Sequence, residues 1–328
     1  MERIAHLTLA ALCTLALIPG CARTAHDAGG PAAAPRFVPL EIGFWSLDRG
    51  IALDRHGNVA LTTDGGRRWR VVGSWGPPRN GYGPRSLSVS RHGSAAFLTR
   101  CWRRGCGELV RTLDGGSSWS TFATRGVDPT AVMVARSQPQ VAWALVDHGA
   151  GPSVRLARSS DGGRTWKPVK SPCRAAWPGL TLISLATRRR GWEMCSSQPA
   201  AGEQPKQLLV TRDAGRSFTS LLDIDPFRHG RRSGGVSISG YTVALSMTAD
   251  GHGLLAEERA PSYRTADGGR DWLPIEHVTQ PDYRDASAAF QLSPRIGYLL
   301  VDGAGRAELY RSTDGDHSWN RTARWNGE

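Results

Sequence analysis

The sequence has none of the short motifs by which many enzyme classes are recognised. Its 328 residues contain no Gly-x-Ser-x-Gly, no His-Glu-x-x-His and no phosphate-binding loop. Zinc-finger spacings are missing as well, and the longest run of basic residues is Arg188-Arg189-Arg190. We therefore expect no cofactor, no metal and no nucleic-acid partner.

Hydrophobic runs long enough to span a bilayer are also missing. Residues 7–18 are predominantly apolar but number only 12, and Arg3 precedes them, which is typical of a signal peptide. The run leads into Leu17-Ile18-Pro19-Gly20-Cys21, which resembles the lipobox of bacterial lipoproteins. The resemblance implies that residues 1–20 are removed and that Cys21 receives a lipid. An ordinary secretory signal with another cleavage site is the alternative.

Either signal places the mature chain outside the cytoplasm, as a cell-membrane lipoprotein or a secreted protein. Residues 21–36 are rich in Ala, Gly and Pro and are expected to form a flexible tether. The net charge of +12, from 41 Lys and Arg against 29 Asp and Glu, suggests a diffuse positive surface facing anionic lipid or cell-wall polymer. A coding bias toward Arg explains the charge equally well.

Cysteine is scarce, with six residues, and two of these belong to the amino-terminal region, Cys13 and Cys21. An even number of four remains in the mature domain, which suggests two disulfides in an exported protein. Proximity in the sequence favours the pairs Cys101–Cys106 and Cys173–Cys195. A metal site is the competing interpretation, but no His stands at ligand spacing beside either pair.

One pattern is present in strength: the eight-residue frame [ST]-x-D-x-G-x-x-[WF] occurs six times. The copies lie at 62–69, 112–119, 159–166, 211–218, 265–272 and 312–319. Their aspartates are separated by 47 to 54 residues and are Asp64, Asp114, Asp161, Asp213, Asp267 and Asp314. Six copies at one period predict a repeat domain. The sixth copy has Asp316 where the other five have Gly.

Each position of the frame has a physical role within a tight turn. Asp and Ser/Thr side chains can hydrogen-bond the backbone of the turn, and the Gly suits a positive φ. The terminal Trp or Phe offers an apolar face to a neighbouring repeat. We therefore interpret the six aspartates as structural and not as catalytic.

Around each frame the sequence predicts four short strands, named A to D in chain order, with the frame joining C to D. In the second unit we expect them at 86–90, 94–100, 108–113 and 118–123. A glycine-containing turn joins A to B in five units, and Pro139-Gln140 stands in its place in the third. Four antiparallel strands per period of about 50 residues are typical of a β-propeller blade. We expect an all-β fold of six blades over residues 37–328, with a seventh blade as the alternative and ring closure unexplained.

In these features the chain resembles the Asp-box (BNR-repeat) propellers. The D-G-G-x-[ST]-W copies are closest in pattern to photosystem II assembly and stability factor propellers, and sialidases share the repeat. The resemblance covers residues 37–328 and implies a propeller fold; it is far less specific for function.

In a four-stranded blade the A–B and C–D turns share one face, and the B–C and D–A connections share the other, which we call the loop-bearing face. The extra length of the repeats falls on the loop-bearing face, where binding usually resides. Its aromatic and Arg side chains are candidate binding residues, since such side chains are favoured at interfaces. They are Trp75, Arg79, Tyr82, Trp102, Arg103, Trp177, Arg228, Arg231, Tyr283 and Arg284.

We expect a lipid-anchored binding protein of assembly or scaffold type, with a protein or cell-envelope glycan as its partner, rather than an enzyme. The alternative is a sialidase-like glycoside hydrolase, because the loops contain the carboxylates Asp223, Asp225, Asp282 and Asp285, and Tyr283 is near two of them in the sequence. Against it, the [FY]-R-I-P motif of sialidases has only weak echoes, such as Pro294-Arg295-Ile296-Gly297. A passive envelope scaffold is a third possibility.

Overall fold

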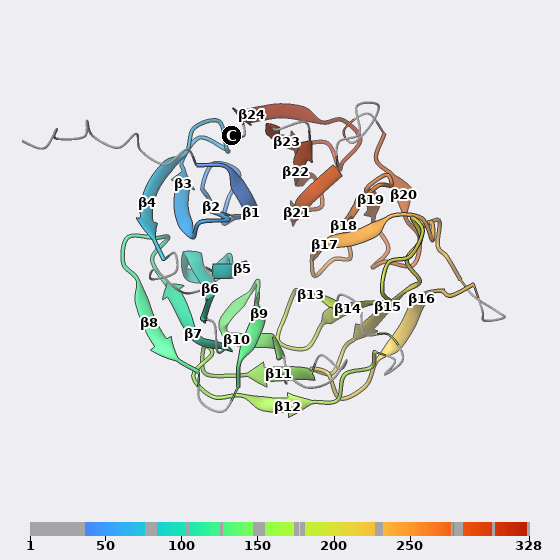
Figure 1. Ribbon diagram of the computed structural model, residues 1–328, viewed down its shortest axis with the longest axis horizontal. Helices are drawn as coiled ribbons and strands as arrows, with labels where there is room; N and C mark the ends of the chain where they lie inside the picture. Colours follow the sequence, from blue (N-terminus) through green and yellow to red (C-terminus); the bar gives the residue numbers. More distant parts are fainter. Residues whose placement is uncertain are drawn as a thin grey trace, which may run out of the picture. The chain divides into compact units, whose positions relative to one another are not determined.

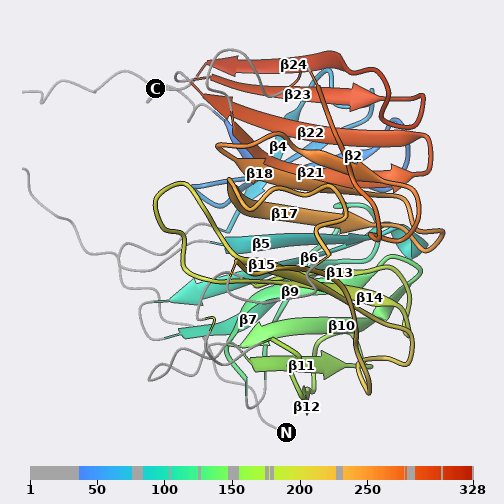
Figure 2. The same ribbon diagram turned by 90° about the vertical axis from the view of Figure 1, so that its right-hand side faces the viewer.

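The computed structural model contains six four-stranded antiparallel sheets arranged as the blades of a β-propeller (Figure 1). It describes residues 37–75, 84–102, 105–124, 127–146, 155–173, 177, 181–226, 232–276, 278, 285–303 and 306–326. Viewed from the side, the strands run across the unit and their connections gather at its two faces (Figure 2). Within these residues no helix is long and apolar enough to cross a membrane.

Every blade is built from four strands that are consecutive in the sequence. Blades 1 and 2 contain β1 (Pro39–Phe44), β2 (Gly50–Asp54), β3 (Asn58–Thr62), β4 (Arg70–Ser74), β5 (Pro84–Ser90), β6 (Ala95–Trp102), β7 (Gly105–Thr112) and β8 (Ser120–Ala123). Blades 3 and 4 contain β9 (Pro129–Ala135), β10 (Gln138–Val146), β11 (Arg155–Ser159), β12 (Lys167–Val169), β13 (Thr181–Leu185), β14 (Gly191–Ser196), β15 (Lys206–Thr211) and β16 (Thr219–Ile224). Blades 5 and 6 contain β17 (Tyr241–Met247), β18 (Gly253–Glu258), β19 (Tyr263–Thr265), β20 (Leu273–Pro274), β21 (Asp285–Ser293), β22 (Ile296–Gly303), β23 (Arg306–Ser312) and β24 (Asn320–Asn326).

The prediction of six four-stranded blades is confirmed, and the expected strands of the second unit differ from β5–β8 by at most three residues at either end. The A–B turn expected at Pro139-Gln140 is wrong. The turn lies at Arg136-Ser137, and Pro139 belongs to β10. The pairing of β9 with β10 shifts register between Gln138 and Ala142, and such an irregular stretch accommodates a proline that has no N–H to donate.

Burial follows the position of a strand within its blade. The second strands β2 and β14 are buried at every residue, because neighbouring blades cover both of their faces. The outermost strand β4 has no buried residue. The apolar runs of the B strands therefore build the core between blades.

The six copies of the frame form six turns with the same hydrogen bonds, which we call the aspartate turns. In each, the Ser or Thr hydroxyl donates to the Asp Oδ1 at 2.7–2.9 Å. The N–H of the fifth residue donates to that hydroxyl oxygen at 2.9–3.2 Å. The N–H of the seventh residue donates to the Asp Oδ1 at 2.9–3.1 Å. Each carboxylate thus satisfies its own turn.

Five of the six aspartate turns are also bonded to the A–B turn of their own blade. The N–H of the fourth residue donates to a carbonyl of that turn, as in Gly65 to Asp48 at 2.9 Å and Gly315 to Arg295 at 3.0 Å. The same bond recurs in blades 2, 4 and 5 at 2.9 Å. In blade 3 the Gly162 N–H donates instead to Gln140 O, just inside β10, at 2.8 Å. The two kinds of turn therefore lie side by side, as expected, and we call their common face the turn face.

The glycine at the fifth position is required by its neighbours as well as by its backbone. Gly66 has a φ of 90°, and a Cβ there would come within 2.6 Å of Leu309 in the adjacent blade. The sixth turn has Asp316 at this position with a φ of 66°, and burial raises the pKa of its carboxyl to about 6. In that turn the indole N–H of Trp319 has no hydrogen-bond partner among the described residues, whereas Trp69 donates to Gly66 O at 2.9 Å. The sixth turn keeps the shared bonds but is the least satisfied.

The ring closes by side-chain packing between blades 6 and 1, because neither blade contributes a strand to the other. The rings of Phe44 and Tyr298 are stacked, with centroids 3.6 Å apart and planes 5° apart. The Tyr298 hydroxyl donates to Leu47 O at 3.0 Å. Trp69 lies against Trp325 of the last strand, with ring centroids 6.5 Å apart. This aromatic contact supplies the closure that the sequence left unexplained.

We expect the aspartate turns to lose stability in acid. Hydrogen bonds from Ser118 and Thr112 lower the pKa of Asp114 from 3.8 to about 2. A depressed folded-state pKa gives stability that is present above about pH 4 and is lost as the pH falls toward about 2. Burial acts oppositely on Glu193, whose pKa rises from 4.5 to about 7, so its contribution is lost as the pH rises through that window.

The measurement is the urea midpoint of unfolding between pH 2.5 and pH 6. The wild type should weaken steadily below pH 4, and Asp114→Asn, which cannot titrate, should show a shallower loss. An identical acid slope in the two proteins would mean that this turn does not contribute to it.

Candidate functional site

The first strand of every blade lines a central channel, which contains a cavity of about 380 Å³. These strands, β1, β5, β9, β13, β17 and β21, surround the axis of the propeller (Figure 1). The volume lies within the range of small-molecule sites in proteins. The channel is therefore the first candidate site among the described residues.

Serine side chains join successive inner strands, which do not pair with one another as a sheet. Each hydroxyl oxygen accepts a backbone N–H from the next blade. The bonds are Val132 to Ser86 (3.1 Å), Val134 to Ser88 (2.9 Å), Met247 to Ser184 (2.8 Å) and Gln291 to Ser246 (2.7 Å). These contacts place hydroxyl groups along the wall of the cavity.

Blade 1 has a carboxyl where blade 2 has such a hydroxyl. Glu41 Oε2 accepts the Leu87 N–H at 3.3 Å, and Glu41 is the only acidic residue among those that line the described cavity. Burial raises the pKa of Glu41 to about 7. The group can thus gain or lose a proton near neutral pH.

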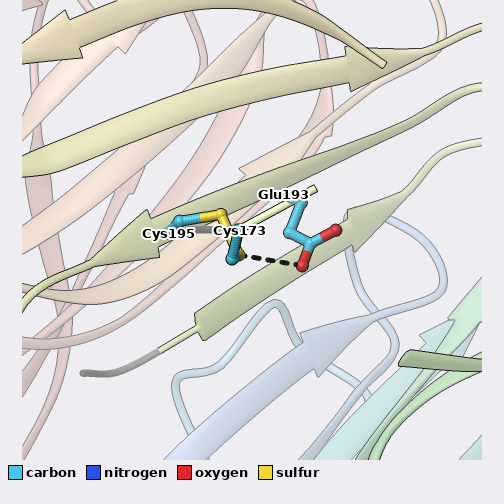
Figure 3. Close-up of side chains that lie close together, drawn as sticks. All are labelled: Cys173, Glu193 and Cys195. Carbon is cyan, nitrogen blue, oxygen red and sulfur yellow. Dashed lines mark hydrogen bonds between the residues drawn. A yellow bond between two sulfur atoms is a disulfide. The ribbon is translucent and has the colours of Figure 1, made fainter. Parts of the chain in front are cut away.

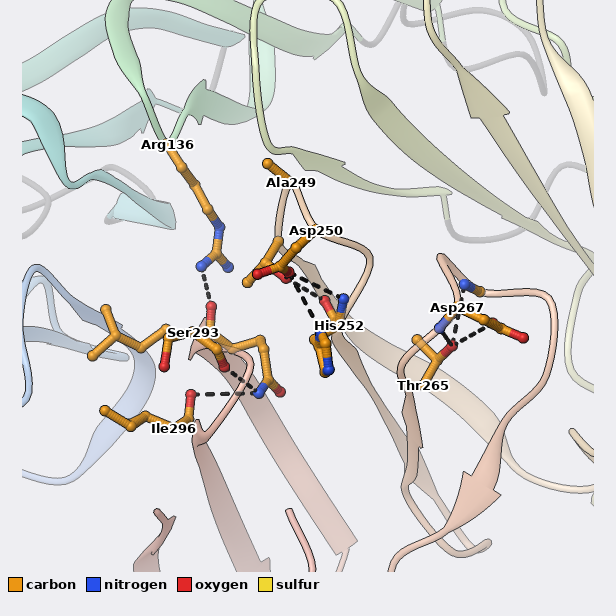
Figure 4. A network of polar contacts seen from close by, with 12 residues as sticks. Arg136, Ala249, Asp250, His252, Thr265, Asp267, Ser293 and Ile296 are labelled. Atoms are coloured by element: carbon orange, nitrogen blue, oxygen red, sulfur yellow. Dashed lines mark hydrogen bonds and ion pairs between the residues drawn. The ribbon is translucent and has the colours of Figure 1, made fainter. Parts of the chain in front are cut away.

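The turn-face end of the channel is crossed by arginine side chains. Arg136 follows β9, and its guanidinium donates to Gln291 O and, at 2.6 Å, to Ser246 Oγ (Figure 4). The guanidinium also lies 4.4 Å from the centre of the Phe290 ring, a cation–π distance. Arg91 lies beside Arg136, since its N–H donates to Arg136 O at 2.9 Å, and its guanidinium donates to Leu292 O at 3.3 Å. Burial lowers the pKa of Arg136 to about 9, so it is a cation at neutral pH.

Asp250 is the carboxylate that favours this cation. It lies in the A–B turn of blade 5 and accepts a hydrogen bond from the Thr248 hydroxyl (Figure 4). His252 Nδ1 lies 3.4 Å from Asp250 Oδ1. These bonds hold Asp250 within its own turn, and it makes no direct ion pair with Arg136.

Cys173 and Cys195 form a disulfide, which is the expected pairing. Cys195 lies within β14 and is buried. Glu193 Oε1 lies 3.1 Å from Cys173 Sγ and accepts a hydrogen bond from the Ser171 hydroxyl (Figure 3). The two sulfurs and a carboxylate oxygen lie within 4.8 Å of one another, but sulfurs joined in a disulfide are not thiolate ligands for a metal.

Most of the candidate binding residues lie outside the described part of the chain. This holds for Arg79, Tyr82, Arg103, Arg228, Arg231, Tyr283 and Arg284, for the side chain of Trp102, and for Cys21. Trp75 and Trp177 are described and half-buried. Trp75 packs against Trp119 at a ring-centroid distance of 4.5 Å, a contact between blades 1 and 2. Binding by these ten residues stays a prediction.

Of the second expected disulfide, the structure describes the side chain of only one cysteine. Cys101 is buried and disulfide-bonded. The side chain of Cys106 lies outside the described residues. The pairing Cys101–Cys106 stays a prediction.

Arg136 and Glu41 were not predicted from the sequence, and neither was a buried ion pair between blades 4 and 5. Lys206 Nζ lies 2.6 Å from Glu257 Oε1, and the side chains are 1% and 0% exposed. Lys206 also donates to Gly240 O at 3.3 Å. The only available signal was a charged residue inside an otherwise apolar strand, which does not say what it meets.

No family model matches the chain. It is 25% identical over 248 residues to a probable oligoxyloglucan-reducing end-specific xyloglucanase of Neosartorya fischeri, an alignment that covers 66% of this chain and 27% of the xyloglucanase. The chain therefore spans about a quarter of the length of that curated relative.

Two solved structures are similar to the propeller. YCF48 from Cyanidioschyzon merolae has a TM-score of 0.51 at 17% identity, covering 88% of this chain and 86% of YCF48. The GH74 xyloglucanase from Xanthomonas campestris has a TM-score of 0.55 at 19% identity, covering 86% of this chain and 45% of that enzyme. At these identities the similarities establish a shared β-propeller fold.

Proposed function

We propose that the protein is an exported, lipid-anchored propeller of the Asp-box type that binds a protein or cell-envelope partner through its loop-bearing face. The observation behind this choice is the hydrogen bonding of the turn face. Five aspartate turns are bonded to the A–B turn of their blade, and the third is bonded to Gln140 at the start of β10. Most polar groups of these turns are therefore satisfied within the blade and leave little for a partner; the Trp319 indole N–H of the sixth turn is an exception. Long connections from D to A strands, such as that from β20 to β21, are assigned to the opposite face. The connection from β16 to β17 is also long, but its Gly234 O accepts the Trp272 N–H of the fifth aspartate turn at 2.7 Å.

Two further observations support the proposal. The shared fold with YCF48 agrees with the sequence resemblance to photosystem II assembly factor propellers, which favours a role in holding another protein. The disulfide Cys173–Cys195 fits an oxidising compartment outside the cytoplasm. A lipid on Cys21 would then keep the propeller at the membrane surface.

Glycoside hydrolysis is the second candidate, because the Xanthomonas xyloglucanase shares this fold and the Neosartorya xyloglucanase is 25% identical over 248 residues. Such chemistry needs two carboxyl groups about 5–10 Å apart at the sugar. Glu41 is the only one among the residues that line the described cavity. Of the loop carboxylates, Asp285 accepts the Arg259 N–H at 2.7 Å, and Asp282 lies outside the described residues.

Site-specific crosslinking tests the choice of face. A photoreactive amino acid at Trp177, on the loop-bearing face, should join the full-length protein to one partner in intact cells. The same group at His317, which is exposed on the turn face, is the matched control and should give no such product. Equal crosslinking from both positions would contradict the proposal. Release of reducing sugar from xyloglucan by the purified protein would support the hydrolase instead.

A second measurement addresses the anchor. Cys21→Ser should move the protein from the membrane fraction to the soluble fraction, whereas Cys13→Ser should leave it at the membrane. Unchanged membrane association of the Cys21→Ser variant would contradict lipid attachment at that residue.

A further inference from the structure

We propose that the cavity in the central channel is a binding site for a small organic anion, whose carboxylate lies at the Arg136 end. This site is separate from the loop-bearing face and does not depend on the proposed partner. It follows from three properties of the cavity wall: an excess of hydrogen-bond donors, a cation without an ion-pair partner, and apolar surroundings.

The donors come from a set of three serines, Ser88, Ser184 and Ser246, which we call the hydroxyl layer. Each makes the same contact in blades 2, 4 and 5, since its oxygen accepts a backbone N–H from the following blade. A hydroxyl has one hydrogen and two acceptor sites. Ser246 Oγ accepts from both Gln291 N and Arg136 Nη2, so both acceptor sites are used and its hydrogen is left to donate. Ser246 therefore offers a hydrogen to a ligand and no lone pair, whereas Ser88 and Ser184 each offer a hydrogen and keep one acceptor site.

The cation is the guanidinium of Arg136, which lines the cavity. No carboxylate among the described residues forms an ion pair with it, and it donates to the neutral oxygens of Gln291 and Ser246. Asp250 acts on it only through space, and Arg91 adds a second positive charge nearby. A half-buried cation without an ion pair is costly, and a bound anion would remove that cost.

The rest of the wall is apolar and selects the kind of anion. Val89, Met133, Leu185, Leu245 and Phe290 line the same cavity. Such a wall favours a ligand with a hydrocarbon body. One guanidinium with neutral hydroxyl donors matches a single negative charge. Arg91 adds positive charge nearby but does not line the cavity, so a phosphate dianion would meet one lining cation with two charges. The geometry therefore favours a carboxylate, which accepts two hydrogen bonds from a guanidinium.

The position of Glu41 indicates how the ligand is oriented in the cavity. It lines the cavity from β1, nearer to the D–A connection, whereas Arg136 follows the last residue of β9 at the turn face. An ionised Glu41 repels a carboxylate, and Arg136 attracts one. The charged end of the ligand would thus lie against Arg136 and its hydrocarbon end toward Glu41.

The test is calorimetric titration of the purified wild-type protein with hexanoate, benzoate and inorganic phosphate. We expect saturable heat with at least one carboxylate and none with phosphate. Arg136→Met should weaken that binding about tenfold to hundredfold, the range for hydrogen bonds to a charged group. Arg232→Gln, which removes an exposed arginine paired with Asp271, is the matched control and should bind as the wild type does.

A second variant keeps the test open if Arg136→Met does not fold. Ala131→Phe fills the cavity without changing its charge and should also abolish the heat, while native mass spectrometry of the wild type should show a bound small acid that is absent from this variant. The proposal is overturned by any of three results. These are no binding of either carboxylate together with no co-purified acid, preferential binding of phosphate, or unchanged binding in Ala131→Phe.

Discussion

Replacing Lys206 with methionine should lower the free energy of unfolding by about 3–5 kcal/mol, measured by urea denaturation at pH 7. Its Nζ lies 2.6 Å from Glu257 Oε1, and neither side chain is more than 1% exposed. Burial raises the pKa of Glu257 and lowers that of Lys206, but the pair has no net charge whichever group holds the proton. Methionine leaves the carboxyl buried alone between blades 4 and 5, and the carbonyl groups of Ser239 and Gly240 lose a donor as well.

Two further variants test whether the loss of stability comes from leaving a buried charge without its partner. Lys206→Met combined with Glu257→Leu should recover most of the lost stability, because replacing both charges with apolar groups is often neutral. The exposed pair Arg232–Asp271, at 54% and 69% exposure, is the control, and Arg232→Met should change stability by less than about 1 kcal/mol. A loss below about 1 kcal/mol for Lys206→Met would show that the buried ion pair contributes little to the stability of the protein.

Phe44→Ala should cost about 3–5 kcal/mol, the usual range for removing a buried aromatic ring. Phe44 is fully buried, stacks on Tyr298 of blade 6 and lies near Trp69 and Phe290. Since no strand crosses from blade 6 to blade 1, this packing is a main contribution to closure. We therefore expect Phe44→Ala to loosen the boundary between blades 6 and 1 and not the whole propeller.

Hydrogen exchange followed by mass spectrometry distinguishes the two outcomes. In Phe44→Ala the amides of β1 and β24 should exchange faster than those of the other blades. Phe97→Ala is the matched control, because Phe97 is equally buried but packs within the core shared by blades 2 and 3. Faster exchange at β1 and β24 in both variants would argue against a special role for the aromatic contact.

The repeat pattern was sufficient to predict the architecture because its information is local. A Ser or Thr, an Asp and, in five copies, a Gly within five residues close a turn by bonds to their own backbone, as the N–H to hydroxyl bonds of 2.9–3.2 Å show. Repeated at nearly constant spacing, these turns set the number of blades and the phase of the strands. The one misplaced turn, at Pro139-Gln140, lay where the third unit departs from the pattern.

The channel chemistry and the ring closure were decided only by the tertiary structure. Arg136 reaches a residue 155 positions away, Tyr298 one 251 positions away and Lys206 one 51 positions away. Nothing local distinguishes these side chains from the other charged or aromatic residues of their strands. Their partners are determined by closing the ring, which brings together segments from different blades. The sequence alone therefore determined the blades and the face that each turn occupies, whereas the cavity, its cation and the contact that closes the ring arise from packing six blades around one axis.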